Sequence, residues 1–248
     1  PGYGSAARYW ATVTQEATRD LAAMRTYDRV LVLECAGRNA GWLTAATALY
    51  RRDERDGPHV LLLPELPFVT ERLMSVVDET LRRVGYCVVA AAETIRDGAG
   101  EYVAQSQAGV DRFGHPIVTA VGETLAQRVA TSLGVKARAN KPGTLQRTSA
   151  VHVSPVDREE AYGAGHAAAE RLAQGESGAM VSLVRRSDDP YTCEFGAASL
   201  AEVANGERRL PPESVMTNAG LATGISDTFE RYAAPLLGPA PEPLYWLA

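Results

Sequence analysis

Three apolar segments rich in valine and leucine constrain the fold of this 248-residue chain more than any other feature. They are RVLVLEC (29–35), HVLLLPE (59–65) and YCVVAAAE (86–93). Their apolar residues are consecutive, whereas a strand with one exposed face alternates apolar and polar residues. The three segments are therefore predicted to be buried strands of a parallel sheet.

Helical patterns of suitable length separate these segments, at 39–50 and 70–84. Strand and helix therefore alternate along the first part of the chain, and this alternation is typical of βαβ units. Such units place helices over the faces of a mainly parallel sheet, because the crossover between parallel strands needs a helix. We expect a layered α/β fold.

Weaker signals follow these units. A helix is expected over 117–133, then a loop over 138–149, and GAMVSLVR (178–185) is a further candidate strand. Proline, glycine and polar residues dominate from Ser187 onward, so that region is expected to be mostly irregular. One more helix is predicted there, at 226–237.

One helix start is marked with particular clarity, in the segment SPVDREEAYGAGHAAAERLAQG. Ser154 can cap the helix, Pro155 suits its first turn, and Asp157 stands three residues after the cap. Gly175 is a fitting stop. The segment between them is predicted to be a long helix.

Composition narrows the classes of function. The formal net charge of −5 and the isoelectric point near 5.5 argue against nucleic-acid and membrane-surface partners, which select for a basic face. Cys35, Cys87 and Cys193 are an odd set without metal-ligand spacing, so they are expected to be reduced thiols of a cytoplasmic protein. No apolar run approaches the roughly 18 residues of a membrane span, and no charged-then-apolar leader opens the chain.

Polar side chains follow the predicted strands where each strand ends. Arg38 follows the first strand, Glu93 closes the third, and Arg138 and Arg147 bracket a loop that carries Lys141. A single arginine after a strand is more often a solvated residue, and a strand-end glutamate is as often a helix cap or an ion-pair partner. The group taken together indicates a sugar phosphate site, because arginine pairs with phosphate and glutamate accepts from hydroxyls.

Other chemistries find little support. The sequence has neither a GxGxxG turn nor a GxxxxGK[ST] loop, so it does not predict nicotinamide or P-loop nucleotide binding. Asp111 and His115 in DRFGH could be a ligand or catalytic pair, although a turn with a partly buried histidine is the favoured interpretation. The other histidines lack metal-ligand spacing, and no Ser–His–Asp set can be nominated.

Several motifs occur in an order that resembles a known family. They are PGYGSAARY, ECAGRNAGW, LPELPF, GYCVVAAAE, DRFGH, KPGTLQR, SPVDREEAYGAGHAA and PYTCEFGAASLAEVANGERRLP. Over nearly its whole length the chain resembles the later two-thirds of a 6-phosphofructokinase, most closely the pyrophosphate-dependent branch. The resemblance implies a three-layer α/β/α, Rossmann-like fold with a parallel-sheet core, incomplete at the N-terminus. It also implies a fructose 6-phosphate-binding domain over 1–146, followed by 147–248 as a return segment to the phosphoryl-donor domain plus a C-terminal extension.

The resemblance implies roles for the first two strand ends. Ala36, Gly37 and Arg38 match the family's MGR segment, which holds fructose 6-phosphate through its backbone and its arginine. Arg38 is thereby implied as the catalytic arginine that stabilises charge on the transferring phosphoryl group. Ala36 replaces the usual methionine and offers a smaller contact. Glu93 matches the glutamate that accepts hydrogen bonds from the sugar.

The family's late R…QR loop matches Arg138 and Arg147, which are implied to hold the 6-phosphate. Thr144 stands where relatives carry histidine or tyrosine. Arg29 and Arg138 resemble arginines that family members lend across a subunit interface, so a homodimer or homotetramer is implied.

The implied reaction transfers a phosphoryl group from Mg²⁺-bound pyrophosphate to the 1-hydroxyl of fructose 6-phosphate, giving fructose 1,6-bisphosphate. The family's donor loop and general base lie upstream of PGYGSAARY, so the chain by itself is expected to be inactive. Two alternatives stay open beside it: ATP as the donor, and a non-catalytic sugar-phosphate-binding subunit. A third alternative is a generic α/β domain whose arginines are only surface residues.

Overall fold

The computed structural model describes residues 2–104, 120–204, 206–242 and 246. Its main sheet has six strands in the order β4-β1-β3-β2-β8-β7. Four of them form a parallel core, in which β1 pairs with β3 and β4, and β3 pairs with β2. These four strands are β1 (Val30–Cys35), β2 (Val60–Leu62), β3 (Cys87–Ala92) and β4 (Ala137–Asn140).

The three apolar segments predicted as buried strands are confirmed. Every residue of β1, β2 and β3 is buried. β4 was not predicted, because its segment ARAN has no apolar run and was expected to be loop. It forms by backbone pairing with β1, and Arg138 stands beside Leu31 in that register.

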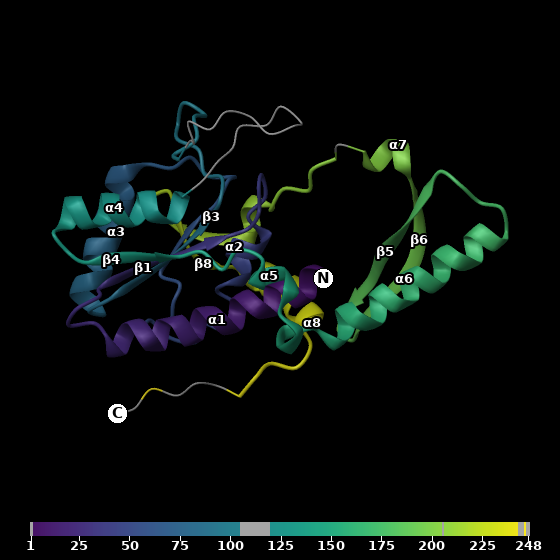
Figure 1. Ribbon diagram of the computed structural model, residues 1–248, viewed down its shortest axis with the longest axis horizontal. Helices are drawn as coiled ribbons and strands as arrows, with labels where there is room; N and C mark the ends of the chain where they lie inside the picture. Colours follow the sequence, from purple (N-terminus) through teal and green to yellow (C-terminus); the bar gives the residue numbers. More distant parts are fainter. Residues whose placement is uncertain (1, 105–119, 205, 243–245, 247–248) are drawn as a thin grey trace.

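Helices cover both faces of the sheet, so the expected three-layer α/β/α architecture is present (Figure 1). On one face lie α1 (Tyr3–Ala23), α2 (Trp42–Ala46) and α8 (Asp227–Leu237), and on the other lie α3 (Thr70–Arg83) and α4 (Val121–Leu133). The patterns at 70–84 and 226–237 predicted α3 and α8 well. The first helix was not predicted, although its Trp10 and Leu21 are completely buried in the core.

The region after Ser187 is more regular than its composition suggested. It contributes β6 (Tyr191–Ser199), β7 (Val215–Asn218) and β8 (Leu221–Ile225), and β8 joins the main sheet antiparallel to β2. Glycines and polar residues are tolerated in these strands because backbone hydrogen bonds, not a continuous apolar run, hold them in place.

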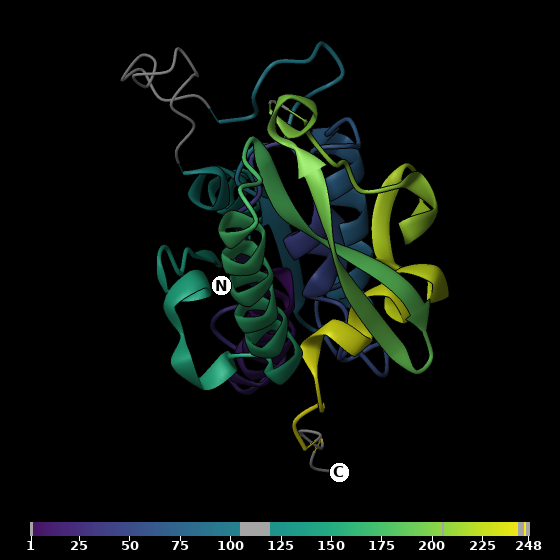
Figure 2. The same ribbon diagram turned by 90° about the vertical axis from the view of Figure 1, so that its right-hand side faces the viewer.

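An arm stands apart from the sheet and comprises α6 (Pro155–Ala173), β5 (Ala179–Asp188), β6 and α7 (Leu200–Val203). Figure 1 shows it to the right of the sheet, and in Figure 2 it lies in front of the sheet and its helices. β5 and β6 form a two-stranded antiparallel hairpin beside α6. None of the residues in these four elements is buried.

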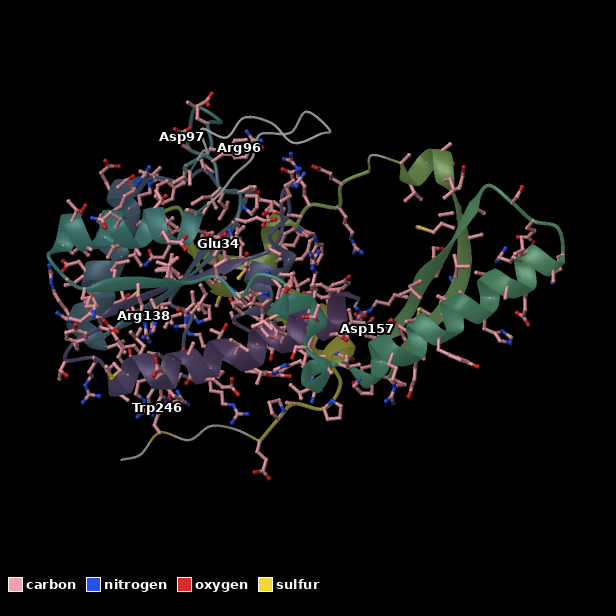
Figure 3. The ribbon with its side chains drawn as sticks, viewed as in Figure 1. Glu34, Arg96, Asp97, Arg138, Asp157 and Trp246 are labelled. Carbon is pink, nitrogen blue, oxygen red and sulfur yellow. The ribbon has the colours of Figure 1, made fainter. Side chains whose placement is uncertain are left out.

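The base of the arm is joined to the core where α6 begins. Ser154 caps α6 by accepting from the Asp157 amide at 3.3 Å, as the sequence predicted. Its hydroxyl donates to the Leu236 carbonyl at 2.7 Å, and the Gly2 amide donates to the Asp157 carboxylate at 2.9 Å. Asp157 also accepts from the Ser5 hydroxyl, and Figure 3 shows it at this junction. The Asp157 carboxylate in the first turn of α6 therefore accepts hydrogen bonds from the start of α1, and these bonds join the two helix N-termini.

The expected division at residue 146 falls within α5 (Leu145–Thr148). The segment after the arm returns to the core, since β7 and β8 extend the sheet and α8 packs against α1. Within the ranges that the structure describes, no helix is long and apolar enough to cross a membrane.

Candidate functional site

The turn after β1 meets the end of β3 at one edge of the sheet. The Glu93 amide donates to the Cys35 carbonyl at 2.9 Å, and the Glu93 carboxylate accepts from the Gly37 amide at 3.3 Å. Gly37 has φ +144°, and a Cβ there would lie 2.7 Å from the Ala40 carbonyl, so a side chain would be strained. Two segments 56 residues apart are thus held side by side, as parallel strand ends predict.

Gln146 ties a third segment to the same place. Its side-chain oxygen accepts from the Ala36 amide at 2.9 Å and from the Trp10 indole at 3.0 Å. Its nitrogen donates to the Gly143 carbonyl at 2.9 Å. Because Gln146 is buried and bonded through both its oxygen and its nitrogen, it fixes the loop that carries its neighbour Arg147 against the turn after β1. We call the turn 36–38, Glu93 and the segment 141–148 the carboxyl edge.

A charged pair lies beneath this edge. Glu34, the penultimate residue of β1, is only 2% exposed, and its carboxylate accepts from the Gly122 amide at 2.8 Å. Its other oxygen lies 2.5 Å from the Lys141 ammonium. Gly122 is in the first turn of α4, where backbone amides favour a negative charge. Figure 3 shows Glu34 inside the sheet region, so the pair joins β1, α4 and the carboxyl edge.

The environment of Lys141 keeps its ammonium charged. Its partial burial lowers the pKa, but the hydrogen bond to Glu34 and the negative charge of that residue outweigh the burial. Glu123 and Glu93 add to this effect, so the pKa of Lys141 ends above its ordinary value. Glu93, the carboxylate bonded to Gly37, is therefore within electrostatic reach of Lys141.

The carboxyl edge presents arginines to solvent. Arg38 and Arg147 are both exposed, the first in the turn after β1 and the second in α5. Thr144, also exposed, precedes α5, and its carbonyl accepts from the Arg147 amide. The structure thus brings together Ala36, Gly37 and Glu93 directly, and places the segment with Thr144 and Arg147 beside them through Gln146.

Arg29 and Arg138 lie elsewhere. Arg29 precedes β1, at the strand end opposite to Arg38, and its guanidinium donates to the Leu81 and Gly85 carbonyls at the end of α3, both at 3.3 Å. Arg138 faces α1 (Figure 3), where it pairs with Asp20 and lies 3.4 Å from the Asp28 carboxylate. The chain's own carboxyl edge therefore forms without either guanidinium.

A cavity of about 500 Å³ lies at the opposite edge of the sheet, where β2 begins. Its lining includes His59, Arg51 and Arg83, and Glu54 pairs with Arg83 at 3.4 Å. Burial, with the nearby Arg51 charge, lowers the pKa of His59 to about 4. This cavity shares no lining residue with the carboxyl edge.

Metal ligands are not clustered in the part of the chain that the structure describes: no three His, Cys, Asp or Glu side chains there come together to hold an ion. Asp111 and His115, left open as a possible pair, lie outside the described residues.

Sequence reasoning missed the two residues that assemble the edge, Gln146 and Glu34. Each left a signal. Gln146 is part of the KPGTLQR motif, and Glu34 is a carboxylate inside an otherwise apolar strand, where a buried charge requires a partner. Their partners, Ala36 and Lys141, could not be read from spacing alone because they are about 110 residues away in sequence.

Comparison with known proteins decides the family. The phosphofructokinase family profile matches residues 1–172, well over half of the chain. The chain belongs to the phosphofructokinase family. Its α/β fold and the resemblance seen in its sequence are thereby confirmed.

Relatives of this phosphofructokinase chain include a curated protein of Xanthomonas campestris, 39% identical over 97% of the chain, named pyrophosphate–fructose 6-phosphate 1-phosphotransferase. An ATP-dependent 6-phosphofructokinase of Mycobacterium leprae is 32% identical over 86% of the chain. A solved pyrophosphate-dependent phosphofructokinase of Marinobacter aquaeolei superposes with a TM-score of 0.80, at 37% identity over 99% of the chain. The chain spans 57% of the Xanthomonas protein, 58% of the Mycobacterium protein and 57% of the solved chain.

Proposed function

We propose that this protein, at its natural length, transfers a phosphoryl group from pyrophosphate to the 1-hydroxyl of fructose 6-phosphate, giving fructose 1,6-bisphosphate. The observation that carries the proposal is the carboxyl edge, where the turn 36–38, Glu93 and the Arg147 segment are held together by Gly37 and Gln146. The greater similarity to the Xanthomonas enzyme than to the ATP-dependent one supports pyrophosphate as the donor.

The roles follow from the chemistry of each group. Glu93 already accepts one hydrogen bond from Gly37, and a carboxylate can accept several, so it has capacity left for sugar hydroxyls. Arg147 and Thr144 would hold the 6-phosphate, since a guanidinium forms paired hydrogen bonds with phosphate oxygens. The backbone at Ala36 and Gly37 is fixed by its hydrogen bonds to Gln146 and Glu93, so it orients the sugar without rearrangement.

Arg38 is assigned the catalytic role. Arg38 is an exposed residue in a fixed turn, from which its guanidinium would reach a phosphoryl group that approaches the sugar from solvent. Phosphoryl transfer needs little covalent help from a protein and depends on positioning and on stabilising charge spread over the phosphoryl oxygens. A general base for the 1-hydroxyl is not assigned to any described residue.

Magnesium would enter with pyrophosphate and neutralise its charge. The described residues do not fit a magnesium site, because they bring no three suitable side chains together. We therefore assign the ligands of the ion to the donor side of the protein.

Arg29 and Arg138 are proposed to serve a neighbouring subunit. Both are turned away from the chain's own carboxyl edge, and Arg138 is partly exposed while paired with two aspartates. A guanidinium forms paired hydrogen bonds with phosphate as well as with carboxylate, so a phosphate of a neighbouring subunit's site could replace the exposed Asp20 as the partner of Arg138. A homodimer or homotetramer would supply such a phosphate at a shared site.

Residues 147–248 are proposed to return the chain to a phosphoryl-donor domain, with a C-terminal extension. The arm supports this proposal: it is unburied, yet it carries large exposed apolar side chains including Tyr162, Leu172 and Leu183. Apolar surface of this kind marks an interface.

The free state of all three cysteines supports a cytoplasmic location.

The test is an aldolase-coupled assay of the protein at its natural length, with pyrophosphate or ATP and magnesium. Turnover with pyrophosphate is expected, and Arg147→Met should raise the KM for fructose 6-phosphate about 10- to 100-fold, the range for one charged hydrogen bond. Arg82→Met, an exposed arginine of α3, is the matched control. Turnover with ATP alone would reassign the donor. Binding of the sugar phosphate without turnover would favour the non-catalytic subunit.

A further inference from the structure

Lys141 is a partly exposed cation whose ion-pair partner, Glu34, is buried. Only two of the 25 lysine and arginine residues in the sequence are lysines, Lys136 and Lys141. The Lys141 side chain is 42% exposed, yet its ammonium lies 2.5 Å from a carboxylate, that of Glu34, that is only 2% exposed. Most exposed ion pairs are loose because both partners move. This one has a buried, immobile partner, so the ammonium is held in one place.

Glu34 itself is held on its other side. Its second oxygen accepts from the Gly122 amide at the start of α4. A Cβ on Gly122 would lie 3.3 Å from that oxygen and 3.2 Å from Ala139, so the space around the carboxylate is closely filled. The carboxylate cannot follow the lysine into solvent, and the position of the ammonium is set by β1 and α4.

The ammonium retains donors for a ligand. An ammonium has three N–H groups, and among the described residues Glu34 is the only hydrogen-bonding or ion-pair partner of Lys141. Lys141 begins the segment 141–148 that Gln146 fastens to Ala36, and its charge acts on Glu93. The free donors therefore stand at the carboxyl edge, on the same short segment as Arg147.

We propose that Lys141, held by the buried Glu34, is a further substrate-binding cation that contacts the phosphate of fructose 6-phosphate. The inference rests on the proposed function, since it assigns one more residue to the same site. Phosphate oxygens accept hydrogen bonds, and the Lys141 ammonium offers them the N–H groups that Glu34 leaves unused, on the same segment as the Arg147 guanidinium. The ammonium is a compact donor whose position is already fixed.

A purely structural role for Lys141 makes a different prediction. A buried carboxylate that loses its partner is strongly destabilising, so Lys141→Met alone disturbs the fold and the site together. In the Glu34→Gln background no buried charge remains to be neutralised. If Lys141 serves only Glu34, adding Lys141→Met to Glu34→Gln leaves fructose 6-phosphate affinity unchanged. If Lys141 binds the phosphate, the double variant binds fructose 6-phosphate more weakly than Glu34→Gln does.

The first measurement is calorimetric titration of the 248-residue chain with fructose 6-phosphate. Glu34→Gln/Lys141→Met is expected to bind about 10- to 100-fold more weakly than Glu34→Gln, the range for one charged hydrogen bond. Lys136→Met is the matched control, because Lys136 pairs with Asp28 at the opposite end of β1. Equal affinities of the single and double variants would overturn the proposal.

The second measurement uses the rarity of lysine. A chain labelled with ¹³Cε-lysine gives two side-chain signals by NMR, which Lys136→Arg and Lys141→Arg assign. Fructose 6-phosphate is expected to shift the Lys141 signal and leave that of Lys136 in place, whereas unphosphorylated fructose shifts neither. A bound sugar phosphate with an unmoved Lys141 signal would overturn the assignment of Lys141 alone. Failure of the protein at its natural length to bind fructose 6-phosphate would instead overturn the proposed function.

Discussion

The parallel core and the arm use similar apolar residues in opposite ways. Every residue of β1 and β3 is buried, while the arm strands β5 and β6 have none buried, although they carry Leu183 and Phe195. The core strands lie between two helical layers, whereas the hairpin has α6 on one side only (Figure 2). The core is thus stabilised by contacts within the described chain. The arm leaves apolar side chains exposed, a feature typical of interaction surfaces.

The core and the arm are stabilised by different interactions. In the core, burial of apolar area is the dominant stabilising term. In the arm, backbone pairing of the hairpin and the junction at Ser154 and Asp157 hold the position instead. Substitutions of equal size should therefore have very different costs in the two regions, and the following predictions measure that difference.

The largest difference is expected for leucine truncation. Leu33→Ala removes a side chain that is 1% exposed between β1 and the α1 layer, and should lower the free energy of unfolding by about 2–5 kcal/mol. Leu183→Ala in β5, where the side chain is 52% exposed, should change it by no more than about 0.5 kcal/mol. Urea unfolding followed by circular dichroism measures both. A large cost for Leu183→Ala would mean that the arm is covered in solution.

Acid should destabilise the core through His59. Burial lowers its pKa from the ordinary 6.5 to about 4, so between these pH values the unfolded chain binds a proton more readily than the folded chain. The contribution to stability is constant above about pH 6.5 and declines as pH falls to 4, by about 3 kcal/mol in total at 1.36 kcal/mol per pKa unit.

Unfolding free energies measured from pH 7 to 4 test this prediction. His59→Asn, which keeps an acceptor for the Val88 amide, should flatten the decline. His166→Asn is the matched control in the arm, where His166 is largely exposed, and it should leave the decline in place. An unchanged decline in His59→Asn would show that other groups cause the acid sensitivity.

The smallest expected difference is in thiol reactivity, where the cysteine of the arm should react faster than the two cysteines of the core. Burial raises the pKa of Cys87 to about 12 and that of Cys35 well above its ordinary value, so neither core thiol should react in the folded chain. Cys193 in β6 is partly exposed, and burial raises its pKa as well, so it should react slowly. One thiol per chain is expected to react with a disulfide reagent before unfolding, and none in Cys193→Ser. Fast reaction of all three would contradict the burial of β1 and β3.

The sequence predicted the parts of the fold that bury continuous apolar runs. β1, β2 and β3 are flanked by helices on both faces, so their composition alone identifies them. β4 and β8 have no such runs and exist because neighbouring strands offer them backbone partners. That pairing is a property of the assembled sheet and leaves no local trace. α1 was missed because alanine and threonine dominate it, which blurs its apolar face.

The candidate site divides in the same way. The meeting of Arg38's turn with Glu93 could be predicted, because parallel strands end at one edge. The position of Arg138 could not, since it depends on β4, where Arg138 stands beside Leu31 and faces α1. The roles of Gln146 and Lys141 depend on contacts with Ala36 and Glu34 that only the folded chain creates.

The central claim is that the carboxyl edge, and not the cavity at the opposite edge, receives the sugar phosphate. Hydrogen–deuterium exchange of the 248-residue chain with and without fructose 6-phosphate tests it directly, because bound ligand slows exchange in the segments that it orders. The account predicts slower exchange at 36–41 and 141–148, with little change at 51–59, which lines the cavity, and in the arm strands β5 and β6. Protection confined to 51–59 would contradict it.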